Sequence, residues 1–154
     1  MDIKQNAEYK ESIMISKELT AIIEQIKKQG KMRFPNGAAE DQIADFENKH
    51  NIKFPSKYRE WLRFCDGGEF FQPAGVQMYG VAHKPIIDVF NNDRPSSNYI
   101  VIGALASGDP ILCEKGNETI SIYNHEAGRI ESDETYEDFY AFLSDLYEML
   151  GIGG

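Results

Sequence analysis

The stretch FPSKYREWLRFCDGGEFF, residues 54–71, combines a proline, apolar residues at helical spacing and a double glycine. Pro55 has a preset φ and lacks the N–H that a first helical turn leaves unpaired, so a helix begins at Pro55 or Ser56. The apolar residues that follow fall at i, i+3, i+4 and i+7, on one stripe: Tyr58, Trp61, Leu62 and Cys65. Gly67 can take the left-handed conformation that closes a helix, and Gly68 is a second permissive joint. The stretch predicts a core helix, its stop and a turn into a sheet.

Helical patterns lie on both sides of this stretch. Residues 7–29 and 39–51 place apolar residues at spacings of three and four. Near the end of the chain, residues 136–150 repeat the pattern, with Thr135 as the N-cap and Gly151 as the stop. These segments predict two N-terminal helices and one C-terminal helix.

The segment between residues 69 and 132 has the pattern of strands. Two short extended runs around a Pro-Ala-Gly turn come first, and one helical turn is expected at residues 86–90. A β-branched run at 99–105 is typical of a buried central strand, and alternating runs at 110–115 and 119–124 flank the hairpin loop GNE. A short strand at 128–132 follows. The order predicts an α+β fold, an antiparallel β-sheet meander packed on one face by helices.

The length and composition of the chain predict one domain over residues 1–154. Within it, we expect residues 1–36 to form an N-terminal helix and loop and residues 39–150 to form the core. A hydrophobic content of 42% is that of a globular chain. The sequence shows no secretion signal and no membrane-spanning run, so we expect a cytoplasmic protein without membrane contact. The cysteines, Cys65 and Cys113, lie in apolar contexts that suit reduced core thiols.

The net charge of −9 is concentrated in one segment. Residues 126–148 hold eight acids against one base, which makes −7 of that total. Such a surface repels nucleic acid and anionic lipid and speeds the encounter with a basic partner. One alternative is that the acids only provide solubility. For Asp133, Glu134, Glu137 and Asp138, the other is a favourable interaction with the dipole of the last helix.

Motifs for chemistry are absent from the sequence. The histidines, His50, His83 and His125, lack the spacing or the cysteine companions of a metal site, and we predict no metal and no cofactor. Cys113, His125 and Asp109 could form a nucleophile, base and orienting carboxylate, as in a small hydrolase. The alternative is a buried thiol and a surface histidine, and we predict that the protein is not an enzyme.

Residues 39–150 resemble the SUKH superfamily, also called the Smi-Knr-like domain. The resemblance rests on Glu47 in a helix, the Phe54-Pro55 step, and then Tyr58, Trp61-Leu62 and Gly67-Gly68. YIVIGALASGDPILCE is similar to the central strand and Gly-Asp turn of the family, with Gly108-Asp109 matching; SIYNHEAGRI and TYEDFYAFLSDL are similar to its later strand and closing helix. The resemblance implies an α+β domain whose bacterial members are mostly immunity proteins bound to a toxin, commonly a nuclease. Fungal relatives regulate wall synthesis through protein contacts.

Resemblance and charge together predict an immunity protein, or antitoxin, that binds a cognate basic nuclease toxin without catalysis. The matching residues are structural, so the expected partner contacts are acids and aromatics outside the motif. They are Asp66 and Glu69 beside the double glycine, Phe71 and Tyr79 as exposed aromatic anchors, and Asp109, Glu126, Glu131 and Asp133 further on. The first rival is a regulatory interaction module with an endogenous partner; the second is the Cys/His hydrolase. Self-association stays open.

Overall fold

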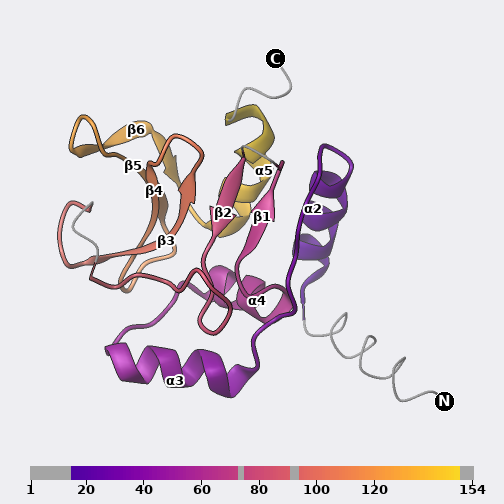
Figure 1. Ribbon diagram of the computed structural model, residues 1–154, viewed down its shortest axis with the longest axis horizontal. Coiled ribbons are helices and arrows are strands. Elements are labelled where there is room, and N and C mark those ends of the chain that lie inside the picture. Colours follow the sequence, from indigo (N-terminus) through magenta and orange to yellow (C-terminus); the bar gives the residue numbers. More distant parts are fainter. Residues whose placement is uncertain (1–14, 73–74, 91–93, 150–154) are drawn as a thin grey trace.

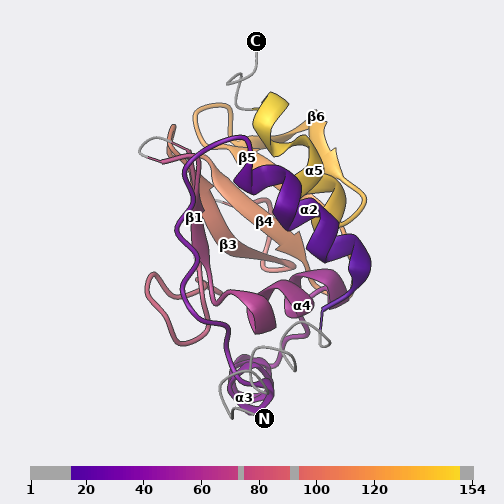
Figure 2. The same ribbon diagram turned by 90° about the vertical axis from the view of Figure 1, so that its right-hand side faces the viewer.

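The computed structural model describes residues 15–72, 75–90 and 94–149, and its elements form two layers (Figure 1). The strands pair in chain order, β1 to β6, in one antiparallel sheet. Helices α2 and α5 lie side by side over one face, with α4 across the end of the sheet and α3 beyond it (Figure 2). The predicted α+β fold is confirmed. The elements are α2 (Lys17–Lys27), α3 (Glu40–His50), α4 (Ser56–Phe64), β1 (Gly68–Phe70), β2 (Val76–Met78), β3 (Tyr99–Leu105), β4 (Pro110–Glu114), β5 (Ile120–Asn124), β6 (Arg129–Tyr136) and α5 (Phe139–Met149).

Helix α4 begins directly after Pro55 and buries its predicted stripe at the centre of the core. The helix ends at Phe64, earlier than predicted, because Cys65 is extended and no longer helical. Gly67 and Gly68 follow with φ of 108° and 113°, a backbone conformation that glycine adopts most readily. The two glycines therefore build the turn into β1, and they do not close the helix.

The carboxylate of Glu47 ties α3 to the start of α4. Its side chain is buried and accepts hydrogen bonds from the N–H of Phe54 (2.9 Å) and from Nε of Arg59 (3.2 Å). A carboxylate taken out of water needs such partners, because its desolvation otherwise costs several kcal/mol. Glu47 thus holds the chain at the Phe54-Pro55 step in the position from which α4 begins.

Helix α4 also receives its N-terminal cap from a distant hairpin. Its own N-cap residue, Pro55, has no side chain that can accept a hydrogen bond. Glu118, in the loop between β4 and β5, accepts from the backbone N–H of Ser56 at 2.7 Å and of Lys57 at 3.2 Å. Its carboxylate satisfies two of the amides that a helix start leaves without partners, and its charge complements the helix dipole.

Replacing Glu118 by alanine should lower the free energy of unfolding by about 1–2 kcal/mol, the usual cost of losing an N-cap. Urea denaturation followed by circular dichroism measures this difference. Glu118→Gln keeps one acceptor oxygen and should lose less than the alanine variant. An unchanged denaturation midpoint for Glu118→Ala would show that the loop does not cap the helix.

Residues 86–90 do not form the predicted helical turn. Ile86 forms a β-bridge with Gly80. The backbone N–H of Asp88 donates to the carbonyl of Val101 in β3 at 3.0 Å, and the N–H of Val101 donates to the carbonyl of Asp88 at 3.1 Å. The reason is that β2 is only three residues long and leaves the edge of β3 open beyond it. The segment therefore continues the sheet.

Strand β6 and helix α5 divide the chain differently from the prediction. Thr135 is not an N-cap, because it lies within β6 and pairs with Ser121 of β5. Helix α5 begins only at Phe139, and Asp138 accepts from the N–H of Ala141 at 2.8 Å. The predicted helix over residues 7–29 is not continuous, because Ser16 is extended and is the N-cap of α2, which runs only from Lys17 to Lys27. The predicted start at residue 7 and the stop at Gly151 lie outside the described residues.

Candidate partner-binding surface

The sheet has a second apolar cluster on the face away from the helices. Residues directly opposite each other in an antiparallel pair share a face, and Leu112 stands opposite both Val101 and Ser121. Val101, Leu112 and Tyr123 form a cluster separate from the main core, and none of the residues packed against it comes from a helix. We call this side of the sheet the uncovered face.

A wide bulge in β6 borders the uncovered face. Tyr123 pairs with Ile130 and Ser121 with Thr135, so the single Ile122 of β5 stands opposite four residues of β6, numbers 131–134. Those four residues read Glu-Ser-Asp-Glu. A bulge leaves its extra residues outside the ladder, and bulges are often found beside functional sites. The register therefore places three carboxylates on a segment that is free of strand pairing.

Two turns meet at the end of the sheet beside this bulge. Asp109, in the turn before β4, accepts from the backbone N–H of His125 at 3.1 Å, and its carboxylate also contacts Nδ1 of that ring. Partial burial works to raise the pKa of Asp109, but the hydrogen bonds from His125 hold it below its ordinary value. The predicted Gly-Asp turn and the predicted histidine connection are thus joined in the structure.

The carboxylates of the bulge and of the Asp109 turn repel one another electrostatically. Glu134 has a raised pKa, first because it is partly buried and then because Asp133, Asp109 and Glu131 repel its charge. Arg129 offers only an exposed ion pair to Glu131, 3.4 Å between Nε and Oε1. We call this group the acidic cluster; it consists of Asp109, Glu131, Asp133 and Glu134. Three of its four members were predicted as contacts, and Glu134 was missed.

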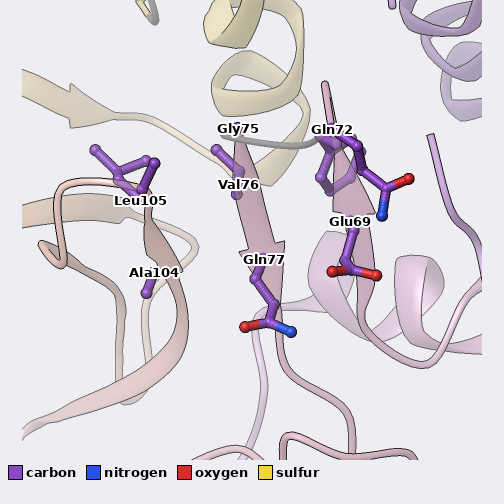
Figure 3. A pocket seen from close by; sticks show the side chains of 9 residues that line it. Glu69, Gln72, Gly75, Val76, Gln77, Ala104 and Leu105 are labelled. Carbon is purple, nitrogen blue, oxygen red and sulfur yellow. The ribbon is translucent and has the colours of Figure 1, made fainter. Parts of the chain in front are cut away.

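Glu126 and Glu69 are the other predicted acids at the surface. Glu126 is exposed in the turn between β5 and β6. Glu69 lies in β1, at the opposite edge of the sheet, with an ion pair to Arg33 at 3.5 Å. Glu69 also lines a shallow pocket of about 200 Å³, together with Gln77 and Ala104 on the neighbouring strands (Figure 3). That volume is below the usual range for small-molecule sites.

Asp66 is not an exposed contact, contrary to the prediction. Its side chain is 3% exposed, and its carboxylate accepts from the backbone N–H groups of Val81 at 2.7 Å, Ala82 at 3.0 Å and His83 at 2.8 Å. The loop that follows β2 folds around this carboxylate because its amides need acceptors. Asp66 therefore belongs to the scaffold.

The predicted aromatic anchors, Phe71 and Tyr79, also pack against other residues of the protein. Phe71 is not exposed: it takes a φ of 56° and packs its ring edge-on against Tyr147 of α5, with centroids 5.5 Å apart. Tyr79 is partly buried between both apolar clusters. Burial, and then the charge of Asp88, raises its pKa. Sequence reasoning missed Phe90, which is 77% exposed beside His50 of α3.

Cys113 does not join Asp109 and His125. It stands opposite Ile120, at the end of β4 away from Asp109, and its fully buried side chain belongs to the helix-facing core. Burial raises the pKa of its thiol to about 12, so the sulfur stays protonated at neutral pH. Cys113 therefore cannot act as a nucleophile for Asp109 and His125.

Neither Cys113 nor Cys65 should react with Ellman's reagent at pH 8 while the protein is folded. Both thiols are free and buried, and burial raises the pKa of each above its ordinary value. Both should react once guanidinium unfolds the chain, which provides the internal control. Stoichiometric labelling of Cys113 in native buffer would instead place it in an accessible site.

In the described ranges, 15–72, 75–90 and 94–149, no three His, Cys, Asp or Glu side chains are grouped so that they could hold a metal ion. Within the same ranges, the helices are too short or too polar to span a bilayer.

The fold and the acidic cluster define an α+β domain that presents carboxylates at one end of its sheet. The chain belongs to the SMI1 / KNR4 family (SUKH-1), whose model matches residues 37–145, more than half of its length. The match includes the Glu47, Phe54-Pro55 and double-glycine features and extends into α5. No curated protein sequence matches the chain. The family is known for immunity proteins, which bind toxin partners.

Proposed function

We propose that this protein is an immunity protein that neutralises a cognate polymorphic toxin by stoichiometric, non-catalytic binding. Its membership of the SUKH-1 family carries the proposal. The arrangement of the candidate chemical groups supports it, because Cys113 is buried and protonated while Asp109 and His125 pair with each other. Residues 1–154 act as one domain in this proposal.

The partner that we propose is a basic nuclease domain. Nucleases bind polyanionic backbones through lysine and arginine, so their surfaces around the active site carry positive charge. The chain has a net charge of −9, and the acidic cluster concentrates part of it at one end of the sheet. Complementary charge of this kind selects the partner and speeds its capture. The same charge disfavours nucleic acid and anionic membranes as ligands.

We place this activity in the bacterial cytoplasm. Both cysteines are free and buried, which fits a compartment where thiols remain reduced. A nuclease toxin would meet its substrates, and therefore its inhibitor, in the same compartment.

Co-expression tests the proposal. The chain should restore growth to bacteria that produce the toxin effector domain encoded beside its own gene, and the two should purify together in a one-to-one complex. Cells that produce the effector domain and carry an empty vector provide the negative control. Failure of the intact chain both to rescue growth and to form a complex would end the immunity proposal. A complex with an endogenous host protein in its place would favour the regulatory rival.

Salt dependence tests the electrostatic part separately. The association rate constant with the effector domain should fall roughly tenfold between low and high ionic strength, because salt screens the attraction between exposed charges. Stopped-flow or surface-based kinetics at several salt concentrations measure the slope. A flat association rate would remove the carboxylates from the recognition step and leave the family assignment unchanged.

A further inference from the structure

The two ends of the sheet differ in how their edges are closed. At the β1 end, the N–H of Arg33 donates to the carbonyl of Glu69 at 2.9 Å, and the N–H of Glu69 donates back to Arg33 at 2.8 Å. The N–H of Gln72 adds a third bond, to the carbonyl of Lys31 at 2.9 Å. At the other end, β6 pairs with β5 alone among the described segments and lies at the margin of the molecule (Figure 2). Strand β6 is therefore the open edge of the sheet.

An open edge invites pairing with another chain, because its outward N–H and C=O groups have no partner strand. Strand β6 is the longest of the six, with eight residues, and Ile130, Thr135 and Tyr136 are of types that favour strands. A second copy of the same chain would offer the same edge, and a two-fold dimer uses one surface twice. Some feature of β6 must oppose this contact if the chain is to stay monomeric.

The bulge, residues 131–134, interrupts the open edge. The ladder with β5 stops after Ile130 and resumes at Thr135, so the paired parts of β6 contain only residues 129–130 and 135–136. A bulge bends its strand and disrupts the ladder, and natural sheets use bulges to turn an edge away from other chains. A strand from a second copy would find two short pieces separated by residues that lie outside the ladder.

The side chains of the bulge act in the same direction. Nδ2 of Asn124 donates to Oε1 of Glu131 at 3.2 Å, which fixes this carboxylate beside the bulge. Asp133 is exposed, and Glu134 already feels the negative charges of its neighbours. An antiparallel β6–β6 pair centred on the bulge would bring the carboxylates of both copies together. Like charges that face each other across a strand pair are destabilising.

We propose that the bulge of β6 and its three carboxylates keep the open edge of the sheet from pairing with a second copy, so that the chain stays monomeric. The inference concerns the fold and does not depend on the proposed function. Its test therefore needs no toxin.

A deletion of Glu131, Asp133 and Glu134 removes the bulge and its charges together. It leaves Ser132 opposite Ile122 and keeps the pairs Tyr123–Ile130 and Ser121–Thr135, because these two pairs then lie two residues apart on both strands. In sedimentation velocity, the native chain should remain a monomer up to millimolar concentration. The deletion variant should be mostly dimeric at about 100 μM, as a dimer with a micromolar dissociation constant is.

A charge variant and a matched control separate edge pairing from a general loss of solubility. Glu131→Gln, Asp133→Asn and Glu134→Gln together keep the length of the bulge and should give a detectable dimer at millimolar concentration. The control is Glu24→Gln, Asp45→Asn and Glu148→Gln, which removes the same number of acids from exposed positions on α2, α3 and α5 and should stay monomeric. Far-UV circular dichroism confirms that each variant is folded.

Hydrogen exchange identifies the surface through which a dimer forms. Protection that rises with concentration at residues 129–136, and not in α2 or α3, supports the proposal. A folded deletion variant that stays monomeric overturns it, as does a native chain that already dimerises through β6 or a control that associates equally. If the deletion variant does not fold, the charge variant decides, and its failure to associate at millimolar concentration overturns the proposal.

Discussion

Replacing Trp61 by alanine is expected to lower the free energy of unfolding by about 4 kcal/mol, which is a large part of the 5–15 kcal/mol that stabilises a typical domain. Trp61 is fully buried, and its indole N–H donates to the carbonyl of Gly67 at 2.9 Å. Its ring lies among four others, with centroids at 5.5, 5.3, 5.4 and 5.9 Å: Phe34, Phe64, Phe70 and Phe139. The substitution therefore opens a cavity where the turn, the sheet and two helices meet.

Far-UV circular dichroism in urea measures this loss, since removal of the only tryptophan also removes the fluorescence signal. Trp61→Phe keeps much of the apolar volume but leaves the Gly67 carbonyl with only the weak thiol donor of Cys65, at 3.4 Å, so an intermediate loss is expected. A loss below about 1 kcal/mol for Trp61→Ala would contradict the burial of the ring, because core truncations of this size cost more.

Asp66→Ala should lower the free energy of unfolding by about 3 kcal/mol, because hydrogen bonds to a charged group contribute more than neutral ones and three amides lose their acceptor together. These amides belong to Val81, Ala82 and His83, in the loop after β2. Denaturation gives the global loss, and hydrogen exchange at the three amides gives the local one.

The neighbouring acid Glu69 is the matched control for Asp66. It is partly exposed and pairs with Arg33 at the surface, so Glu69→Ala should change stability by less than about 0.5 kcal/mol. Equal losses for the two variants would mean that Asp66 does not organise the loop. The loss of stability for Asp66→Asn should lie between those of Asp66→Ala and Glu69→Ala, since an amide offers one acceptor oxygen where the carboxylate offers two.

The elements predicted best are those whose pattern is local. The stripe on α4, the β-branched run of β3 and the hairpin between β4 and β5 all occur where periodicity and turn residues place them. The bulge of β6 has no such signal, because strand register depends on pairing with β5 and on which side chains the core admits. The same reason explains why Thr135 ends in a strand and why residues 86–90 extend the sheet.

For the candidate surface, the sequence predicted the sign of the charge and several of its carriers. It placed Asp109, Glu131 and Asp133 among the contacts, and the structure brings these three together with Glu134. It could not separate Asp66 from them, because an acid beside a glycine turn looks the same whether its oxygens face water or backbone amides.

The sequence by itself determined the fold class, the family and the negative charge, since apolar spacing, turn residues and composition act locally or additively along the chain. Only the tertiary structure decided which carboxylates stabilise the scaffold and which remain at the surface. It also decided that the sheet keeps an apolar face that no helix covers. These properties depend on which distant backbone groups and side chains meet, and long-range strand pairing determines that.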